Sequence, residues 1–183
     1  MPDNQVLAEV ITSLNHATER LVLRRFNEAD IPLEIEHERN PQIMKYIADI
    51  DYSDALEDSV REFIGPWTAD EGEWTSLAVS LPERTDFIGM VCLRFESVEY
   101  SRIEIGYRFH PDYHGNGYAT EAVQLLCALL FETYDVHKIN AVIDIRNKPS
   151  IHLVQRLNFK QEAHFVNNYW DKKQKLWFDE YQF

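Results

Sequence analysis

The sequence predicts a mixed α/β fold, in which a mostly antiparallel sheet of about seven strands is flanked by helices in an α+β arrangement of three layers. Three observations favour this fold class. Several segments alternate apolar and polar residues with the period of two that is typical of strands. Two of them, 74–81 and 87–95, are joined by a short turn, which predicts an antiparallel hairpin. The segments 102–109, 118–131 and 138–145 then predict a strand, helix, strand unit.

The first third of the chain predicts mainly helices. Residues 1–19 are expected to form an additional N-terminal helix, because apolar residues share one helical face: Val6, Leu7, Val10, Ile11 and Leu14. A strand is predicted over 21–26 and a helix over 27–38, which is entered through acidic residues and a proline. A short helix is predicted from Pro41, and another from a cap at Ser53 to about Trp67.

The remaining elements follow the glycine-bearing centre of the chain. The strand 102–109 alternates four apolar residues, Ile103, Ile105, Tyr107 and Phe109, with polar residues or glycine. The segment 138–145 alternates in the same way and predicts one continuous strand. A helix is expected from Pro149 to Leu157, and the strands 159–169 and 174–181 close the chain.

Composition limits the class of protein. With 183 residues, of which 45% are hydrophobic, the chain can bury one core, and we expect one domain over 1–183. Cys92 and Cys127 lie in apolar runs without C-x-x-C spacing, so we expect reduced, buried thiols in the cytoplasm and no metal site. No apolar stretch is long enough for a bilayer. The net charge of −13 argues against nucleic acid or an anionic membrane as a partner and favours a cationic one.

The turn Gly115–Asn116–Gly117 stands at the start of the helix predicted over 118–131. The first turn of a helix presents unpaired N–H groups and the positive end of the macrodipole, which suits a phosphate. Glycines admit a positive φ and keep side chains away from the bound group. Because no lysine or arginine lies between Pro111 and Phe131, backbone amides would hold a pyrophosphate there. An ordinary loop before a helix is the alternative for such a short motif.

A dinucleotide-binding turn is an alternative interpretation of these glycines. That fingerprint needs its first glycine directly after the strand and a third small residue. Residues 110–114 intervene here, and Thr120 takes the third place, so we reject this interpretation.

The stretch around the turn resembles the acetyl-CoA signature of the GCN5-related N-acetyltransferases, the GNAT superfamily. Glu104 to Tyr107 matches E-x-G-Y, and Pro111 to Ala122 matches P-x-Y-x-G-x-G-Y-A-T-E-A of the Rim-type branch, which includes enzymes that acetylate ribosomal-protein N-termini. Asn147, Ser150 and L-N-F at 157–159 resemble the family's N-x-x-S and L-G-F motifs. The resemblance covers roughly 19–183. Asp112 departs from the usual Gln or Arg, and Asn158 replaces a glycine as a left-handed C-cap.

The resemblance implies an enzyme that moves an acetyl group from acetyl-CoA to a primary amine by direct attack in a ternary complex. The central strands would splay to bind the cosubstrate. Asn147 would hold the pantetheine arm, and a backbone N–H between Tyr107 and Phe109 would meet the charge on the acetyl oxygen. The full set of cofactor-binding residues implied is Tyr107, Arg108, Phe109, His114, Gly115, Asn116, Gly117, Tyr118, Ala119, Thr120, Asn147 and Ser150.

Two residues are candidates for proton transfer. Glu104 is expected to be the base that deprotonates the amine, directly or through water; an ion pair with Arg102 or Arg108 is the alternative. Ser150, near the thioester sulfur by resemblance, is the candidate acid, and capping of the helix it opens is the alternative. A tyrosine is the acid in many relatives, and the sequence does not choose among Tyr107, Tyr113, Tyr134 and Tyr169.

Weaker candidates have a plainer interpretation. His110 and His114 are expected at the surface or at the rim of the cofactor site. Cys127 lies within a predicted helix with no base beside it, which argues against a nucleophile.

The acceptor is expected on the side built from residues 27–74. Nine acidic residues against Arg61 alone could attract a cationic amine, although acidic helices are usually just solvated: Asp49, Asp51, Asp54, Glu57, Asp58, Glu62, Asp70, Glu71 and Glu73. Trp67 and Trp74 could supply apolar or cation–π walls. Expected partners are acetyl-CoA, a protein N-terminal or small cationic amine and, in a homodimer, a second copy of the chain. Other small-molecule acetylation, including polyamine acetylation, and a non-catalytic acyl-CoA sensor are the alternatives.

Overall fold

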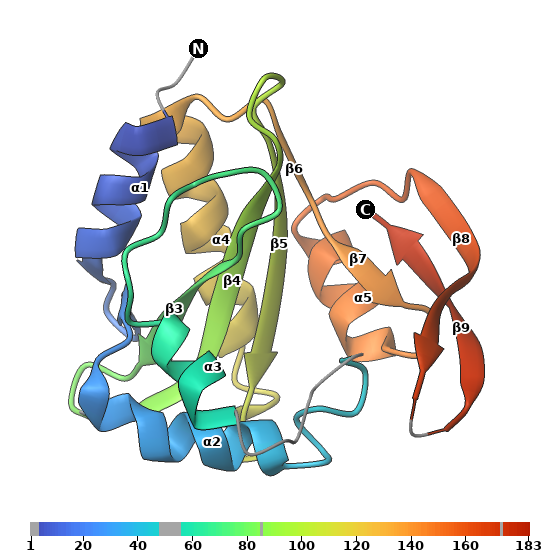
Figure 1. Cartoon of the computed structure of the whole chain (residues 1–183), viewed down its shortest axis with the longest axis horizontal. Coiled ribbons are helices and arrows are strands. Elements are labelled where there is room, and N and C mark those ends of the chain that lie inside the picture. Colours follow the sequence, from blue (N-terminus) through green and yellow to red (C-terminus); the bar gives the residue numbers. More distant parts are fainter. Residues whose placement is uncertain (1–3, 48–55, 85, 173) are drawn as a thin grey trace.

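The computed structural model describes residues 4–47, 56–84, 86–172 and 174–183, and it confirms the mixed, mostly antiparallel α/β fold (Figure 1). The described strands form two sheets rather than the predicted one. Six strands make the larger sheet, in spatial order β1 (Asn15–Ala17), β2 (Val22–Arg25), β3 (Thr75–Ser80), β4 (Phe87–Ser97), β5 (Arg102–Phe109) and β6 (Lys138–Asn140). The smaller sheet has the order β7 (Val142–Asp144), β9 (Leu176–Gln182) and β8 (Ala163–Asp171). Only the β5–β6 pair is parallel among these strands.

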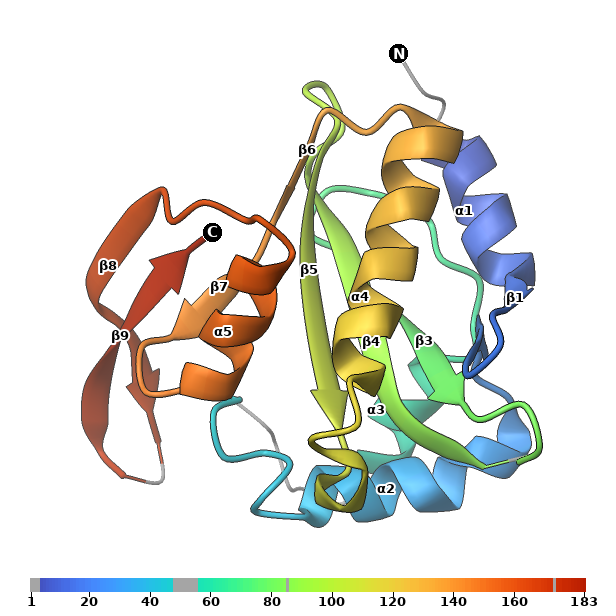
Figure 2. The same ribbon diagram turned by 180° about the vertical axis from the view of Figure 1, so that it is seen from behind.

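Helices cover both faces of the larger sheet. Helices α1 (Asn4–Ser13) and α4 (Tyr118–Ala128) lie on one face, and α2 (Ile31–Arg39) and α3 (Leu56–Glu62) lie toward the other (Figures 1 and 2). The alternation of β3 explains this arrangement, because Leu77 and Val79 join the core with α1 and α4, while Ala78 packs in the cluster on the opposite face. Helix α5 (Lys148–Arg156) packs beside the smaller sheet.

Several helices and strands begin or end at residues other than those predicted. The N-terminal helix stops at Ser13, and the strand β1, which we did not predict, follows it. The segment after Pro41 forms turns instead of a helix, and its residues Ile43 and Met44 are buried. Helix α4 passes at Leu129 into a short π-helical turn that ends at Thr133. Strand β8 begins four residues later than the predicted start at residue 159.

Helix α3 ends at Glu62, before the predicted end near Trp67, and the cap predicted at Ser53 lies outside the described residues. Arg25 explains the end of this helix. Its guanidinium donates to the carbonyl oxygens of Phe63, at 2.8 Å, and Gly65, at 2.5 Å, so these carbonyls have a partner other than the helix.

The strand predicted over 138–145 divides at Ala141. Residues 138–140 pair with β5, but Ala141 exchanges two backbone hydrogen bonds of 3.0 Å with Phe183, and β7 continues alongside β9. Strand β5 runs on to Phe109 without a neighbouring described strand on that edge. Figures 1 and 2 both show that β5 and β7 diverge from the point where β6 pairs with β5.

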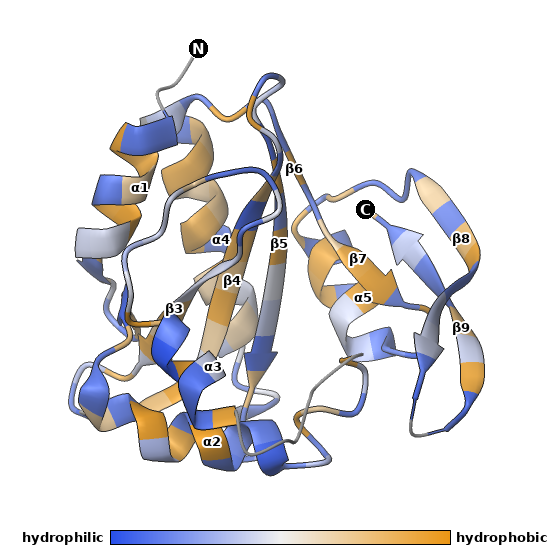
Figure 3. Cartoon of the chain, viewed as in Figure 1, coloured by the Kyte–Doolittle hydropathy of each residue, from blue (hydrophilic) through white to orange (hydrophobic). Residues whose placement is uncertain are grey.

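One hydrophobic cluster connects the two sheets. It contains Leu7 and Ile11 of α1, Leu126 of α4, Val154 of α5 and also Phe183. Figure 3 shows apolar residues concentrated in α4 and in the strands of the larger sheet. In the part of the chain that the structure describes, no helix is long and apolar enough to cross a membrane.

Helix α2 is tied to β5 by a buried ionic cluster. The guanidinium of Arg108 bonds the carboxylate of Glu34 and also lies 2.6 Å from that of Glu38. Helical spacing of i, i+4 brings the two acids to one face. The pKa of Glu34 is raised to about 7, mainly because the carboxyl group is buried; the nearby charge of Glu38 also raises it, and Arg108 acts in the opposite direction.

This cluster predicts a pH dependence of stability. The folded pKa of Glu34 lies above its ordinary value of 4.5, so the folded protein binds the proton more tightly than the unfolded chain. That contribution is complete below pH 4.5 and is lost as the pH rises through 7. We expect Glu34→Gln to reduce the difference in unfolding free energy between pH 5 and pH 8 by about 1–3 kcal/mol in urea titrations.

Glu36→Gln is the matched control, because Glu36 lies on the exposed side of the same helix. Its pH difference should equal that of the unchanged protein. An unchanged pH difference in Glu34→Gln would show that Glu34 takes up no proton on folding.

Candidate active site

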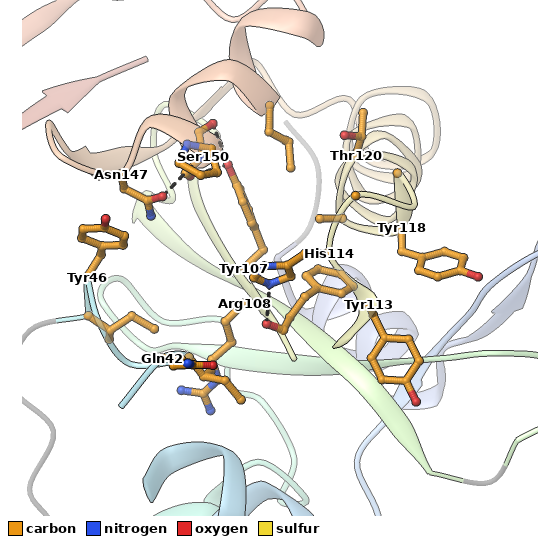
Figure 4. A pocket seen from close by; sticks show the side chains of 18 of the residues that line it. Gln42, Tyr46, Tyr107, Arg108, Tyr113, His114, Tyr118, Thr120, Asn147 and Ser150 are labelled. Atoms are coloured by element: carbon orange, nitrogen blue, oxygen red, sulfur yellow. Dashed lines mark hydrogen bonds between the residues drawn. The ribbon is translucent and has the colours of Figure 1, made fainter. Parts of the chain in front are cut away.

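A cavity of about 470 Å³ opens where β5 leaves its parallel neighbour (Figure 4). Four parts of the chain line it: the end of β5, the glycine turn with the first turn of α4, the beginning and one face of α5, and the segment 42–47. The predicted cofactor residues on its wall are Tyr107, Arg108, Phe109, His114, Gly115, Gly117, Tyr118, Ala119, Thr120, Asn147 and Ser150. Residues far apart in sequence therefore meet at the predicted site.

The glycine turn has the backbone that its sequence predicts. Gly115 and Gly117 have φ values of +78° and +81°, and Gly117 is the N-cap of α4. A Cβ at Gly115 would have no atom within 4 Å, so this backbone is open. Asn116 was predicted to bind the cofactor but is not among the lining residues. Its amide instead donates to the carbonyl oxygens of Tyr113 and His114, at 3.3 and 3.2 Å, and braces the turn.

His114 connects the turn to the end of β5. Its Nε2 lies 2.9 Å from the carbonyl oxygen of Phe109. Since a carbonyl oxygen only accepts, Nε2 carries the proton in this bond. His114 is exposed at the cavity wall, which agrees with the rim position expected for it.

Two hydroxyl groups meet inside the cavity. The hydroxyl of Tyr107 lies 2.7 Å from Oγ of Ser150, and burial raises the pKa of Tyr107 to about 12 (Figure 4). Both groups therefore keep their protons near neutral pH. Helix capping does not occupy Ser150, because the N-cap is Asn147, whose Oδ1 accepts from the backbone N–H of Ser150 at 3.3 Å.

Glu104 lies on β5 but is not among the residues that line the cavity. Its partner is Arg94 of β4, rather than Arg102 or Arg108 as the alternative supposed. Both Nε and Nη2 of Arg94 donate to Oε2 of Glu104, at 3.0 and 2.7 Å. Among the described residues no bond engages Oε1, and the side chain retains 11% exposure. One carboxylate oxygen thus stays available to solvent.

The other tyrosine and cysteine candidates have different surroundings in the structure. Tyr113 lines the cavity, whereas Tyr134 is buried in the core and Tyr169 donates to Asp144 at 2.5 Å. Burial raises the pKa of Cys92 and of Cys127 to about 12. Their thiols stay protonated, which agrees with the argument against a cysteine nucleophile.

None of the described acids of the acidic segment lines the cavity. Asp49, Asp51 and Asp54 fall outside the described residues, and the six described acids are not among the lining residues: Glu57, Asp58, Glu62, Asp70, Glu71 and Glu73. Trp67 is buried in the core and stacks on Phe95, so it is no acceptor wall. Trp74 is partly exposed, but Arg94 lies over its ring at 4.8 Å.

Sequence reasoning missed several lining residues. The segment after Pro41 contributes Gln42, Ile43, Tyr46 and Ile47, and α5 contributes Pro149, Leu153 and Arg156. Arg156 ends α5 and was indistinguishable in sequence from a solvated helix-terminal arginine. Only the tertiary structure, which brings both α5 and the segment 42–47 to the end of β5, identifies these residues.

Known proteins share this architecture. Residues 20–160 match the model of a protein family that is described as "Acetyltransferase (GNAT) domain". The uncharacterized N-acetyltransferase p20 of Bacillus licheniformis is 29% identical, over 91% of this chain and 92% of its own.

Two solved structures have the same fold. An acetyltransferase of the GNAT family from Bacillus anthracis superposes with a TM-score of 0.79 and 25% identity, over 92% of this chain and 96% of its own. A spermidine N-acetyltransferase from Vibrio cholerae, solved in complex with CoA and spermine, has a TM-score of 0.76 and 21% identity, over 90% and 94% of the two chains. The family match extends over most of the chain and includes both the glycine turn and Ser150, so the chain belongs to the GNAT family and is an acetyltransferase.

Proposed function

We propose that the protein transfers an acetyl group from acetyl-CoA to a primary amine by direct attack. The observation that carries this proposal is the divergence of β5 from β7, which opens a cavity between the glycine turn and Ser150. An extended thioester could lie along the open edge of β5, with phosphates at one end and the acyl group at the other. Membership of the Rim-type branch stays a prediction from the P-x-Y-x-G-x-G-Y-A-T-E-A match.

The residues present fit the cosubstrate. The amides from Gly117 to Thr120 stand at the N-terminus of α4 and would bind the pyrophosphate. The amide of Asn147 would bind the pantetheine arm through Nδ2, because Oδ1 already accepts from Ser150. Acetyl-CoA, when bound, supplies the activated acyl group.

The edge of β5 can stabilise negative charge on the acyl oxygen. His110 donates its backbone N–H to Ile88 of β4 at 2.9 Å. Backbone N–H groups alternate between the two edges of a strand, so those of Tyr107 and Phe109 face the open edge. Either could donate to the developing oxyanion.

Proton transfer requires a base for the amine and an acid for the departing thiolate. We assign the base to Oε1 of Glu104, acting through water, because Arg94 engages only Oε2. The amine nitrogen loses a proton through the water to Oε1 of Glu104 and forms the amide bond as the carbon–sulfur bond breaks. The sulfur takes the proton of Oγ of Ser150, which takes the hydroxyl proton of Tyr107 in turn, and solvent returns a proton to Tyr107.

Two features support a cationic acceptor. The net charge is −13, which favours the approach of a protonated amine. The Vibrio cholerae structure of the same fold holds spermine, and spermidine N(1)-acetyltransferase of Escherichia coli is 27% identical over 70 residues. A polyamine and a protein N-terminus are therefore the acceptors to compare.

The proposal is tested with a panel of amines: spermidine, spermine, peptides with free N-termini, and an aminoglycoside. Free thiol released from acetyl-CoA is the measurement. We expect acceptor-dependent turnover with at least one cationic amine. Binding of acetyl-CoA without transfer to any member would favour the acyl-CoA sensor.

A matched pair of glycine variants tests whether CoA binds at the glycine turn. Gly117→Val should weaken CoA binding more than tenfold, because valine at a φ of +81° distorts the phosphate turn. Gly72→Val imposes a similar strain at a φ of +87°, outside the cavity, and should leave CoA affinity unchanged. Equal effects of the two variants would place the cofactor elsewhere.

The two proton-transfer roles predict different effects on the dependence of kcat on pH. Glu104→Gln should lower kcat by about 10² and remove the gain in rate on the basic limb, since no carboxylate then accepts the amine proton. Ser150→Ala should lower kcat by about 10–10² and keep that limb. Neither should change the Kd of acetyl-CoA by more than about threefold.

Glu96→Gln is the matched control for Glu104, because Glu96 is another carboxylate on a strand. It accepts a hydrogen bond from Asn140, which pairs with Glu104 in the sheet. It should retain the rate of the unchanged protein. A Glu104→Gln variant as active as Glu96→Gln would leave Glu104 as a structural partner of Arg94.

A further inference from the structure

An arginine from the start of the chain lies against the glycine turn. Nη2 of Arg20 donates to the carbonyl oxygen of Asn116 at 3.1 Å, and the guanidinium lies over the ring of Tyr118 at 4.9 Å. A Cβ placed at Gly117 would meet only this Nη2, at 3.7 Å, within a radius of 4 Å. The turn has no cation of its own in sequence, and the fold brings one to it.

The same arginine neutralises an acid that stands in an unfavourable place for anion binding. Glu121 is in the first turn of α4, where it would repel a phosphate at the helix N-terminus. Nε of Arg20 donates to Oε2 of Glu121 at 2.8 Å, and the hydroxyl of Thr18 donates to Oε1 at 2.9 Å. Both carboxylate oxygens are thus engaged by the segment 18–20.

We propose that Arg20 is a positioning residue of the pyrophosphate site, acting through Glu121 and Asn116. Arg20 cancels the charge of Glu121 and fixes the carbonyl of Asn116 away from the ligand, so that the amides of the first turn of α4 face a phosphate without a competing anion. This inference rests on the proposed binding of CoA at the turn. An exposed ion pair by itself contributes little to stability, so the effect should appear in binding rather than in folding.

Isothermal calorimetry with CoA tests this role in four proteins: the unchanged chain, Arg20→Ala, Glu121→Gln and the double variant. We expect Arg20→Ala to raise the Kd about tenfold, because the charge of Glu121 then has no cation to neutralise it beside the phosphates. Glu121→Gln alone should bind within about threefold of the unchanged protein, and the double variant should recover to that range. In the transfer assay, Arg20→Ala should raise KM for acetyl-CoA and leave kcat unchanged.

Arg61→Ala is the matched control, because Arg61 has similar exposure, 46% against 49%, and also pairs with carboxylates, but its partners are Glu28 and Glu57 rather than Glu121 of α4. It should leave the Kd unchanged. Dephospho-CoA, which lacks the 3′-phosphate, should show the same tenfold effect in Arg20→Ala.

Three results would overturn the inference: an unchanged Kd in Arg20→Ala, a loss that persists in the double variant, or a loss that disappears with dephospho-CoA. If the unchanged protein fails to bind CoA at all, the proposed function fails instead. The two failures are therefore distinguishable.

Discussion

The structure depends on a change of hydrogen-bond partner at Ala141. Up to Asn140 the chain pairs with β5, and at Ala141 it exchanges its backbone bonds with Phe183 instead. Phe183 is buried in the main core, so its side chain holds this alternative partner in place. A continuous parallel pair would have closed the edge of β5 and left no room for the cavity. The smaller sheet is therefore what keeps the larger one open.

Local chemistry explains why the glycine turn could be predicted. Positive φ at Gly115 and Gly117, and also at Asn158 after α5, follows from which residues tolerate the left-handed region. The hairpin of β3 and β4 could likewise be predicted, because its alternation and its turn lie within one short stretch. These features involve residues that are close in sequence.

Pairing across long distances could not be predicted in the same way. Alternation in 138–145 indicates which side chains share a face, but it carries no information on which strand lies beside them. The partner of Glu104 was missed for this reason, since Arg94 becomes its neighbour only through the register of β4 with β5. Tyr107 and Ser150 were each identified, but their contact depends on how α5 sits against β5.

Charge is distributed differently from what the composition suggested. The described acids of the segment 49–73 do not line the cavity, whereas Glu34 and Glu38 lie in the interior, paired with a cavity-lining arginine. Pairing a buried charge is needed because an unpaired one is costly. In the proposed function, the acidic surface would attract a cationic amine at long range. The cavity itself is lined by aromatic, apolar and hydroxyl groups together with Arg108 and Arg156.

In the proposed function, the open edge of β5 and the glycine turn together hold the thioester. A crystal structure of the protein with CoA would show whether they do. We expect pyrophosphate density against the amides between Gly117 and Thr120, with the sulfur between β5 and Ser150. Well-defined CoA density at any other surface, with the cavity occupied by solvent alone, would contradict the proposal.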